Sequence, residues 1–434
     1  MSKVYGIDLG TTNSLLGLNG ELLTGLVPSV VDLKTGEAGS AVFERDNAER
    51  SFKINMSLFK DGELSVAASA RVLRQLVVES KHDVHDVVIS VPAYFNDNQR
   101  QATRKAAEIA GLNVVTLINE PTAAAIYHSR DRRALSVVFD LGGGTFDVSV
   151  IDSRLGDYDV QSSKGIILGG DNFDQALRNC VIRQSGIKPH HFYPEDMARL
   201  QRRVCKSKIQ LQKTRAPVEI DLTDFEVGHY TLTPEVYVDV MKTVFAPAIR
   251  LTKQVMLLSV PDDNYDLVMV GGSTHCPYLR EWIAQELKHE PVPLTYDPDR
   301  IVALGATIYA QMVADGTAEV QVSDVTKALC IALHNGTTQP IIPQDSKIPV
   351  EDSVTMVNPV ETDTLTLRLF QGDALMAEDN EFIGALEYPY GRVVAPDEGV
   401  VTVTVRVEAD GSIYFSCREL LGESVERKLS RVNR

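Results

Sequence analysis

The sequence predicts an α/β protein whose two similar lobes hold one ligand between them, followed by a small antiparallel β domain. Two glycine turns carry the first half of this prediction. Each follows an apolar strand and contains the triplet Asp-Leu-Gly, once within residues 5–14 and once within residues 138–150. The second half rests on residues 364–369 and 401–408, where apolar and polar side chains alternate strictly, as they do in half-buried strands.

The mid-chain turn places three consecutive glycines, with Thr145, between Asp140 and Asp147. Glycine amides can wrap an anionic phosphate as a backbone nest. Carboxylates beside such a nest are explained by a hydrated cation that lies between them and the phosphates. A plain glycine hairpin is the alternative for one copy of this pattern. The second copy, Asp8 to Asn13, favours two lobes that grip one ligand from both sides.

A third glycine turn, residues 271–274, follows the apolar residues 268–270. None of the three turns contains the Walker sequence Gly-Lys-Ser/Thr or the Rossmann spacing Gly-x-Gly-x-x-Gly. Nucleotide-binding folds built on those motifs are therefore set aside.

Several blocks of the sequence, in this order, resemble the DnaK-type 70-kDa heat-shock chaperones. The blocks are residues 7–14, 91–97, 118–125, 140–147 and 168–174 and the turn Gly271-Gly272. Residues 52–53 and 86–91 look most like the HscC-type branch of that family. The resemblance implies a duplicated actin- and sugar-kinase-like ATPase domain over residues 1–319, an interdomain linker over 320–325 and a β-sandwich peptide-binding domain over 326–434.

Composition limits the classes of partner and compartment. The chain has 434 residues, enough for two or three cores, and a formal net charge of -16. Nucleic acid and anionic membranes need basic surface, so neither is expected as the main partner. The five cysteines form no Cys-x-x-Cys pair, which disfavours a disulfide framework or a zinc site. No basic-then-apolar leader and no membrane-spanning run are present, so we expect a cytoplasmic protein.

Periodicity and turn residues predict the elements of the ATPase domain in order. Residues 4–31 should form short strands with turns at Asn19-Gly20 and at Pro28. The elements expected after them are helices over residues 62–80, 98–110, 195–212, 277–287 and 301–313, a helix that starts near Asp171, a helix over 234–258 interrupted near Pro247, and strands over 86–91, 114–118 and 265–270. Trp282 should pack in the core.

The resemblance assigns catalytic and metal-binding roles in the cleft. Lys53 aligns with the family's catalytic lysine, where a compact cation would stabilise the transferring phosphoryl group; a solvated surface lysine is the alternative. Glu120 follows a strand at its carboxyl end, where ligands of open sheets bind, and the alternative is a helix-start glutamate. The implied catalytic residues are Lys53, Asp140, Thr145 and Asp147, and the implied Mg²⁺ residues are Asp8, Glu120 and Asp147.

The cofactors that the resemblance implies are ATP or ADP, Mg²⁺ and K⁺. The implied nucleotide-binding residues are Gly10, Thr11, Thr12, Asn13, Gly142, Gly143, Gly144, Gly169, Gly170, Asp171, Lys208, Gly271, Gly272, Ser273, His275 and Asp299. Four residues depart from the family pattern: Asp171 replaces a glutamate, Cys205 an acidic residue, Gln212 a serine and His275 an arginine. These departures predict altered nucleoside affinity or base selectivity, with His275 able to stack on a base.

The resemblance also implies protein partners: unfolded or extended peptide, a J-domain co-chaperone and a nucleotide exchange factor. Thr116 stands where the family commonly has an arginine used by J-domain partners. The linker keeps Asp324, but Gln321 and Ser323 dilute its apolar run, so its docking should bury less apolar area and couple the domains weakly. Family members continue into a helical lid past the point where this sequence stops, and without a lid bound peptide should leave quickly.

The leading hypothesis is an ATP-dependent chaperone that hydrolyses ATP between its lobes to control binding of extended apolar peptide by the β domain, as in the stress response and protein folding. A second hypothesis is a nucleotide-dependent regulatory or scaffolding module with little coupled refolding activity. For the C-terminal β domain, the alternative is a β module that has no peptide-binding groove. A sugar kinase or an actin-like filament protein is a third hypothesis, which the complete set of chaperone blocks and the C-terminal β domain disfavour.

Overall fold

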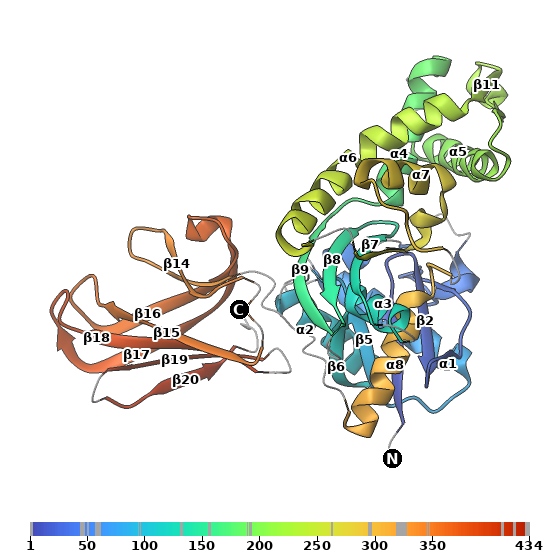
Figure 1. Cartoon of the computed structure of the whole chain (residues 1–434). Helices are drawn as coiled ribbons and strands as arrows, with labels where there is room; N and C mark the ends of the chain where they lie inside the picture. Colours follow the sequence, from blue (N-terminus) through green and yellow to red (C-terminus); the bar gives the residue numbers. More distant parts are fainter. Residues whose placement is uncertain are drawn as a thin grey trace.

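The computed structural model places an α/β part before an all-β part (Figure 1). The residues it describes are 3–43, 48–49, 52–56, 62–93, 95, 97–130, 133–154, 158–188, 190, 193–261, 264–293, 297–317, 328–344, 346, 348–408, 412–419 and 422–429. The predicted linker over 320–325 lies outside them, and so do Asp410 and Gly411, a dipeptide for which we expect a hairpin turn before the strand that follows. Across the described ranges, no helix is both long and apolar enough to cross a membrane.

The first lobe is built on a sheet with the strand order β3-β2-β1-β5-β6, and β4 pairs with β2. Its strands are β1 (Val4–Leu9), β2 (Asn13–Leu18), β3 (Glu21–Leu22), β4 (Val27–Pro28), β5 (Asp86–Val91) and β6 (Asn113–Asn119). Asn19 and Gly20 join β2 to β3 with positive φ angles of 54° and 80°, which is the tight turn that Asn-Gly favours. Pro28 lies in the short strand β4 and not in the turn we expected; a marginal strand tolerates a residue without an amide hydrogen.

The second lobe repeats the central pattern of the first. Its sheet has the order β12-β7-β8-β9, from β7 (Leu135–Leu141), β8 (Phe146–Asp152), β9 (Asp159–Ile166) and β12 (Asp266–Val270). β7 and β8 form an antiparallel hairpin, as β1 and β2 do, and β12 lies parallel to β7 as β5 lies parallel to β1. The two Asp-Leu-Gly turns are therefore equivalent hairpin turns, as predicted.

The helices of each lobe bury one face against that lobe's own core. α1 (Glu63–Ser80) and α2 (Asp97–Ala110) belong to the first lobe. The second lobe has α4 (Gly170–Ser185), α5 (Pro194–Thr214), α6 (Pro234–Ser259), α7 (Pro277–Leu287) and the hairpin of β10 (Val218–Asp221) and β11 (His229–Leu232). Trp282 is buried, as expected.

The interruption we expected at Pro247 is wrong, because α6 continues through it without a break. An internal proline costs a helix roughly 3 kcal/mol. Phe245, Ala248 and Ile249, on either side of Pro247, are buried in the core of the second lobe. Burying large apolar side chains returns about 1.5–3 kcal/mol each, so tertiary packing offsets the proline.

Two helices join the lobes. α3 (Glu120–His128) and α8 (Ile301–Asp315) lie against each other between the sheets, in a cluster that includes Val4 and Val88 of the first lobe and Val138 and Val268 of the second (Figure 1). The helices approach so closely that a Cβ on Gly305 would lie 1.7 Å from the carbonyl oxygen of Ala123. Only glycine fits this crossing.

The C-terminal part is a sandwich of two four-stranded antiparallel sheets. One has the order β14-β13-β16-β17, from β13 (Leu329–Ala332), β14 (Thr338–Ile342), β16 (Thr362–Gln371) and β17 (Glu381–Val394). The other has the order β15-β18-β19-β20, from β15 (Val350–Val357), β18 (Val400–Val407), β19 (Ile413–Glu419) and β20 (Val425–Lys428). Alternate residues of β16 and β18 face the core between the sheets, as the alternation predicted.

Replacing Gly305 by alanine should destabilise the α/β part by about 2 kcal/mol or more, because the added methyl group forces α8 away from α3. Urea denaturation of the whole chain measures this. The matched control is Gly25→Ala, since a Cβ at Gly25 meets no atom within 4 Å. A Gly305→Ala protein as stable as the wild type would contradict the close crossing.

Candidate functional site

A cleft of about 390 Å³ opens where the two hairpin turns face each other. Thr11 and Thr12 line it from the β1–β2 turn, and Gly142 and Gly143 line it from the β7–β8 turn. The turns nearly touch, because a Cβ on Gly143 would lie 2.3 Å from the hydroxyl oxygen of Thr12. The structure thus brings together the two turns that the sequence paired.

Backbone amides in these turns are open to a ligand. In the described part of the chain, the amides of Thr11, Thr12 and Gly143 donate no hydrogen bond to the protein. By contrast, the Gly142 amide donates to the Thr145 carbonyl oxygen at 3.0 Å and closes its turn. Amides left open on both sides of one cleft are the donors that a chain of phosphates requires.

Carboxylates converge at the same end of the cleft. Asp8 is the last residue but one of β1, and Asp140 lies in β7, directly across from Asp147 of β8. Asp8 and Asp140 line the cleft with Glu120, whereas Asp147 is buried and does not line it. Burial and the neighbouring Glu120 raise the pKa of Asp8 to about 6, although the Ser90 hydroxyl donates a hydrogen bond to it at 2.6 Å. Burial, followed by the charges of Glu120 and Asp8, raises the pKa of Asp140 well above its usual range.

The ammonium group of Lys53 lies beside these carboxylates. The residue lies in a short 3₁₀ helix (Phe52–Asn55), is 2% exposed, and its ammonium group pairs with the Glu120 carboxylate. Its ammonium nitrogen also lies 5.8 Å from the centre of the Phe95 ring. The charge of Lys53 lowers the pKa of both Asp8 and Asp140, but burial and mutual repulsion outweigh it. The solvated surface lysine we considered is therefore wrong.

The start of α4 closes one wall of the cleft. Its first amides are already used within the protein: Gly170 donates to the Gly142 carbonyl oxygen at 3.0 Å and Asp171 to that of Gly143 at 2.7 Å. Gly170 and Asp171 line the cleft, whereas Gly169 packs beneath it, where a Cβ would lie 2.3 Å from the Gly143 carbonyl oxygen. These amides hold the glycine turn in place.

Gly271, Gly272 and Ser273 line the cleft from the third glycine turn, and the Ser273 hydroxyl donates to the Gly142 carbonyl oxygen at 2.9 Å. Asp299, which precedes α8, also lines it and lies close to Gly272, where a Cβ would be 2.8 Å from Asp299 Oδ1. Lys208 lines the far wall, with its ammonium group 2.5 Å from Asp174.

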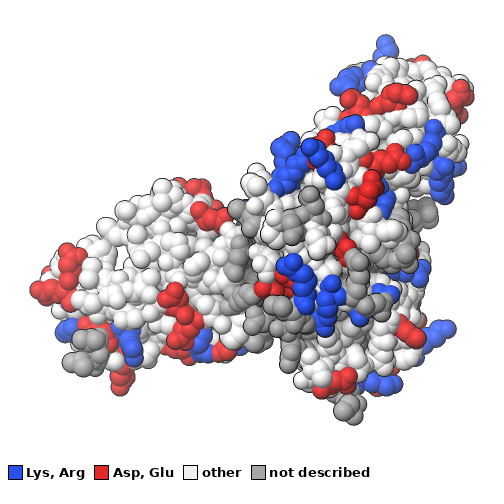
Figure 2. Space-filling view, viewed as in Figure 1, with Lys and Arg blue, Asp and Glu red and all other residues white. Residues whose placement is uncertain are grey.

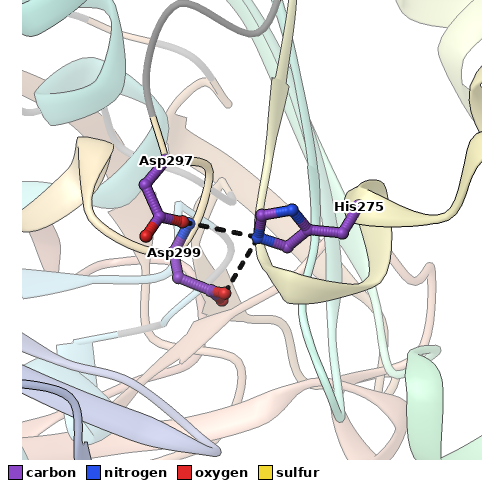
Figure 3. Close-up of side chains that lie close together, drawn as sticks. All are labelled: His275, Asp297 and Asp299. Carbon is purple, nitrogen blue, oxygen red and sulfur yellow. Dashed lines mark hydrogen bonds and ion pairs between the residues drawn. The ribbon is translucent and has the colours of Figure 1, made fainter. Parts of the chain in front are cut away.

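His275 does not line the cleft. Figure 3 shows its ring directed toward Asp297 and Asp299, with Nε2 lying 3.1 Å from Asp299 Oδ2 and 3.4 Å from Asp297 Oδ1. The hydrogen bond to Asp299, followed by the charges of both aspartates, raises the pKa of His275. Stacking of His275 on a base would require this triad to open, and it stays a prediction.

The residues present fit a polyphosphate with a divalent cation. Asp8, Glu120 and Asp140 supply hard oxygen ligands in the cleft, and Lys53 alone does not balance their charge. Burial, followed by repulsion from the neighbouring carboxylates, raises the pKa values of Asp8 and Asp140, and the charge of Lys53 does not offset this. Open amides beside them complete a site of the size that a nucleotide needs.

Comparison with known proteins agrees with this geometry. Residues 41–431 match the family model described as "Hsp70 protein". The chain belongs to the Hsp70 family. Its relatives include the "Chaperone protein HscA homolog" of Cupriavidus metallidurans, 32% identical over 98% of this chain and 77% of that protein, and the equally named protein of Herminiimonas arsenicoxydans, 32% identical over 96% and 76%. The "Chaperone protein dnaK" of Guillardia theta is 32% identical over 96% and 77%.

Some residues of this Hsp70 site escaped the sequence analysis. Ser90 holds Asp8 in place, Asp174 holds Lys208 and also accepts from the Cys205 thiol at 3.2 Å, and Phe95 packs against Lys53. A polar residue inside the buried run of β5 was a signal for Ser90. No pattern in the sequence pairs Asp174 with Lys208, because the contact depends on how α4 packs against α5.

The Asp8→Asn variant of this Hsp70 protein should be more stable than the wild type near neutral pH in the absence of nucleotide and divalent cation. Because the folded-state pKa of Asp8 is about 6, above its ordinary value of 3.8, stability falls as pH rises through that window. Asparagine removes this cost, roughly 1–3 kcal/mol at about pH 7.5, and still accepts from Ser90.

Urea denaturation at several pH values measures the effect. The gain should vanish below about pH 4, where the aspartate is protonated in both states. Asp83→Asn, at an exposed position of the same lobe, is the control. A gain that does not depend on pH would contradict the charge repulsion.

Proposed function

We propose that this Hsp70 protein binds and hydrolyses ATP in the cleft and uses the nucleotide state to control the binding of extended apolar peptide by its β domain. ATP binding and hydrolysis are supported by one observation: two glycine turns with open amides meet the carboxylates of Asp8, Glu120 and Asp140 beside one buried lysine. Phosphoryl transfer needs this combination of placement and charge neutralisation more than covalent help.

Each group has a role in the proposed reaction. Amides of both turns hold the phosphates, and Lys53 neutralises charge that develops on the transferring group. Asp140, Thr145 and Asp147 orient the attacking water, and the raised pKa of Asp140 makes it a stronger base. Mg²⁺, held through Asp8, Glu120 and Asp147, would supply charge neutralisation on the phosphates, and K⁺ is the second cation we propose.

The β domain supports the peptide-binding part with a groove of about 520 Å³. Its walls come from the end of β13, the end of β15 and the middle of β16, with apolar side chains such as Leu333, Met356, Leu365 and Leu367. This groove favours a peptide-binding domain over a β module without a groove. Figure 2 shows that a broad area of this domain's visible face carries neither acidic nor basic side chains.

Asn358 fixes one rim of the groove. Its side chain is buried and donates to the carbonyl oxygens of Val360 and Ala395 at 2.9 and 2.8 Å, while its carbonyl oxygen accepts from the Gly399 amide at 2.7 Å. The neighbouring residues Val357 and Pro359 line the groove. The rim is thereby tied to the loop between β17 and β18, which is a rigid support for an extended ligand.

A nucleotide-dependent regulatory or scaffolding module is the second candidate. Thr116, on the half-buried surface of β6, carries no charge where the family commonly offers an arginine to J-domain partners. Weak coupling to a co-chaperone would follow, with little refolding activity. The HscC-like branch and a cytoplasmic location remain part of our proposal, as does binding of a nucleotide exchange factor.

Peptide affinity in the two nucleotide states separates these candidates. A labelled apolar heptapeptide should bind at least about tenfold more weakly with ATP than with ADP, measured by fluorescence anisotropy, because ATP shifts the β domain to a low-affinity state. Leu333→Asp should abolish binding by placing an unpaired charge in the groove.

Leu375→Asp is the matched control, since Leu375 is 72% exposed and does not line the groove. Equal peptide affinity with ATP and ADP would contradict coupling between the nucleotide cleft and the β domain. The regulatory or scaffolding module would then be the better description. Peptide binding that survives Leu333→Asp would show that the groove is misplaced.

A further inference from the structure

A histidine and two aspartates converge beside the cleft. His275 ends the short 3₁₀ helix Gly272–His275, and Asp297 and Asp299 belong to the turn that leads into α8. Figure 3 shows the imidazole ring of His275 directed toward both carboxylates. One potential metal-binding atom from each of the three side chains lies within 4.8 Å of the other two. The cluster therefore combines one imidazole nitrogen with two carboxylate oxygens.

The spacing of these atoms is that of ligands around a small metal ion. Nε2 of His275 lies 3.1 Å from Asp299 Oδ2 and 3.4 Å from Asp297 Oδ1. Zn²⁺ holds nitrogen and oxygen ligands at about 2.0–2.2 Å in a tetrahedron, so its ligand atoms lie roughly 3.3–3.6 Å apart. An ion can therefore take the place of the Nε2 proton with small movements of the three side chains.

Backbone contacts hold the two segments in position. The Gly271 amide donates to the Pro298 carbonyl oxygen at 3.1 Å, which ties the third glycine turn to the turn that carries both aspartates. Within that turn, the Asp299 amide donates to Asp297 Oδ1 at 3.1 Å, and Arg300 Nε lies 3.0 Å from Asp297 Oδ2. Because these contacts already order the ligands, binding an ion costs little further conformational entropy.

A plain ion pair is the alternative, in which a charged imidazole lies beside two aspartates. The side chains of His275, Asp297 and Asp299 are 47%, 37% and 26% exposed, so such a pair is worth little to the fold. The same exposure gives an ion a path from solvent and leaves room for water as a fourth ligand. Two carboxylates also match the double charge of a divalent ion.

We propose that His275, Asp297 and Asp299 bind a divalent transition-metal ion, best represented by Zn²⁺, with water as the fourth ligand. Imidazole selects zinc over Mg²⁺ and Ca²⁺, which prefer oxygen ligands alone. The bound ion joins two segments that line the cleft, since Gly272 and Asp299 both do so. This site is separate from the carboxylates beside Lys53, and it does not depend on the proposed function.

The test is a titration of Zn²⁺ into the nucleotide-free full chain, in competition with a chelating dye and in a large excess of Mg²⁺. It is run above neutral pH, because the pKa of His275 is raised and the ion must displace a proton. The wild type should bind zinc, and His275→Gln should bind it about 100-fold or more weakly, since even outer partners of metal ligands contribute about 10–100-fold.

Three further variants separate the cluster from other zinc ligands. His85→Gln is the matched control, because His85 is an exposed histidine that lies beside the single carboxylate of Asp86; it should keep the wild-type affinity. Asp8→Asn, in the cleft, should keep it as well. His275→Arg should lose zinc binding and remain folded, because arginine keeps a cation beside both aspartates but has no lone pair for a metal.

X-ray absorption at the zinc edge identifies the ligands directly. The account predicts nitrogen and oxygen neighbours at about 2.0–2.2 Å and no sulfur. Equal zinc affinity of the wild type and His275→Gln, sulfur among the ligands, or a wild type that binds no zinc would each overturn the site and leave an ion pair only. None of these results bears on ATP hydrolysis, so the proposed function stands or fails separately.

Discussion

Three carboxylates, those of Asp8, Glu120 and Asp140, meet one buried lysine between the two lobes, and the rest of the α/β part holds them there. Asp8, Asp140 and Asp147 lie on hairpin strands, and Glu120 starts the helix that joins the lobes. Burial, followed by repulsion among Asp8, Glu120 and Asp140, raises the pKa values of Asp8 and Asp140. The lobes therefore meet where buried negative charges repel one another. A cation bound together with a polyphosphate would compensate this charge.

Close packing of backbone makes that meeting possible. Gly305 lets α8 cross α3, Gly143 lets one hairpin turn reach Thr12 of the other, and Gly169 lets the start of α4 lie beneath the turn. Gly305 and Gly143 lie at contacts between segments far apart in sequence and set the spacing of the lobes, whereas Gly169 fixes the turn within the second lobe.

The sequence predicted the fold class, the duplicated hairpins and most elements, because apolar strands followed by glycine turns and strict alternation are local signals. It also indicated Lys53, Asp8 and Glu120 through resemblance to a family. It did not predict the continuous α6, since the packing of Phe245 and Ile249 that offsets Pro247 is tertiary. The pairing of His275 with Asp299 and the contacts of Tyr237 with Gln212 and Cys276 join residues on separate elements, so no local pattern reveals them.

Single-turnover hydrolysis of ATP by the wild type and by Lys53→Ala tests the central claim most directly. If the buried lysine neutralises the transferring group, the rate constant should fall by about 100-fold or more in the variant. Lys34→Ala, an exposed lysine of the same lobe, should keep the wild-type rate. A Lys53→Ala protein that hydrolyses ATP as fast as the wild type would contradict the assignment of this cleft as the catalytic centre.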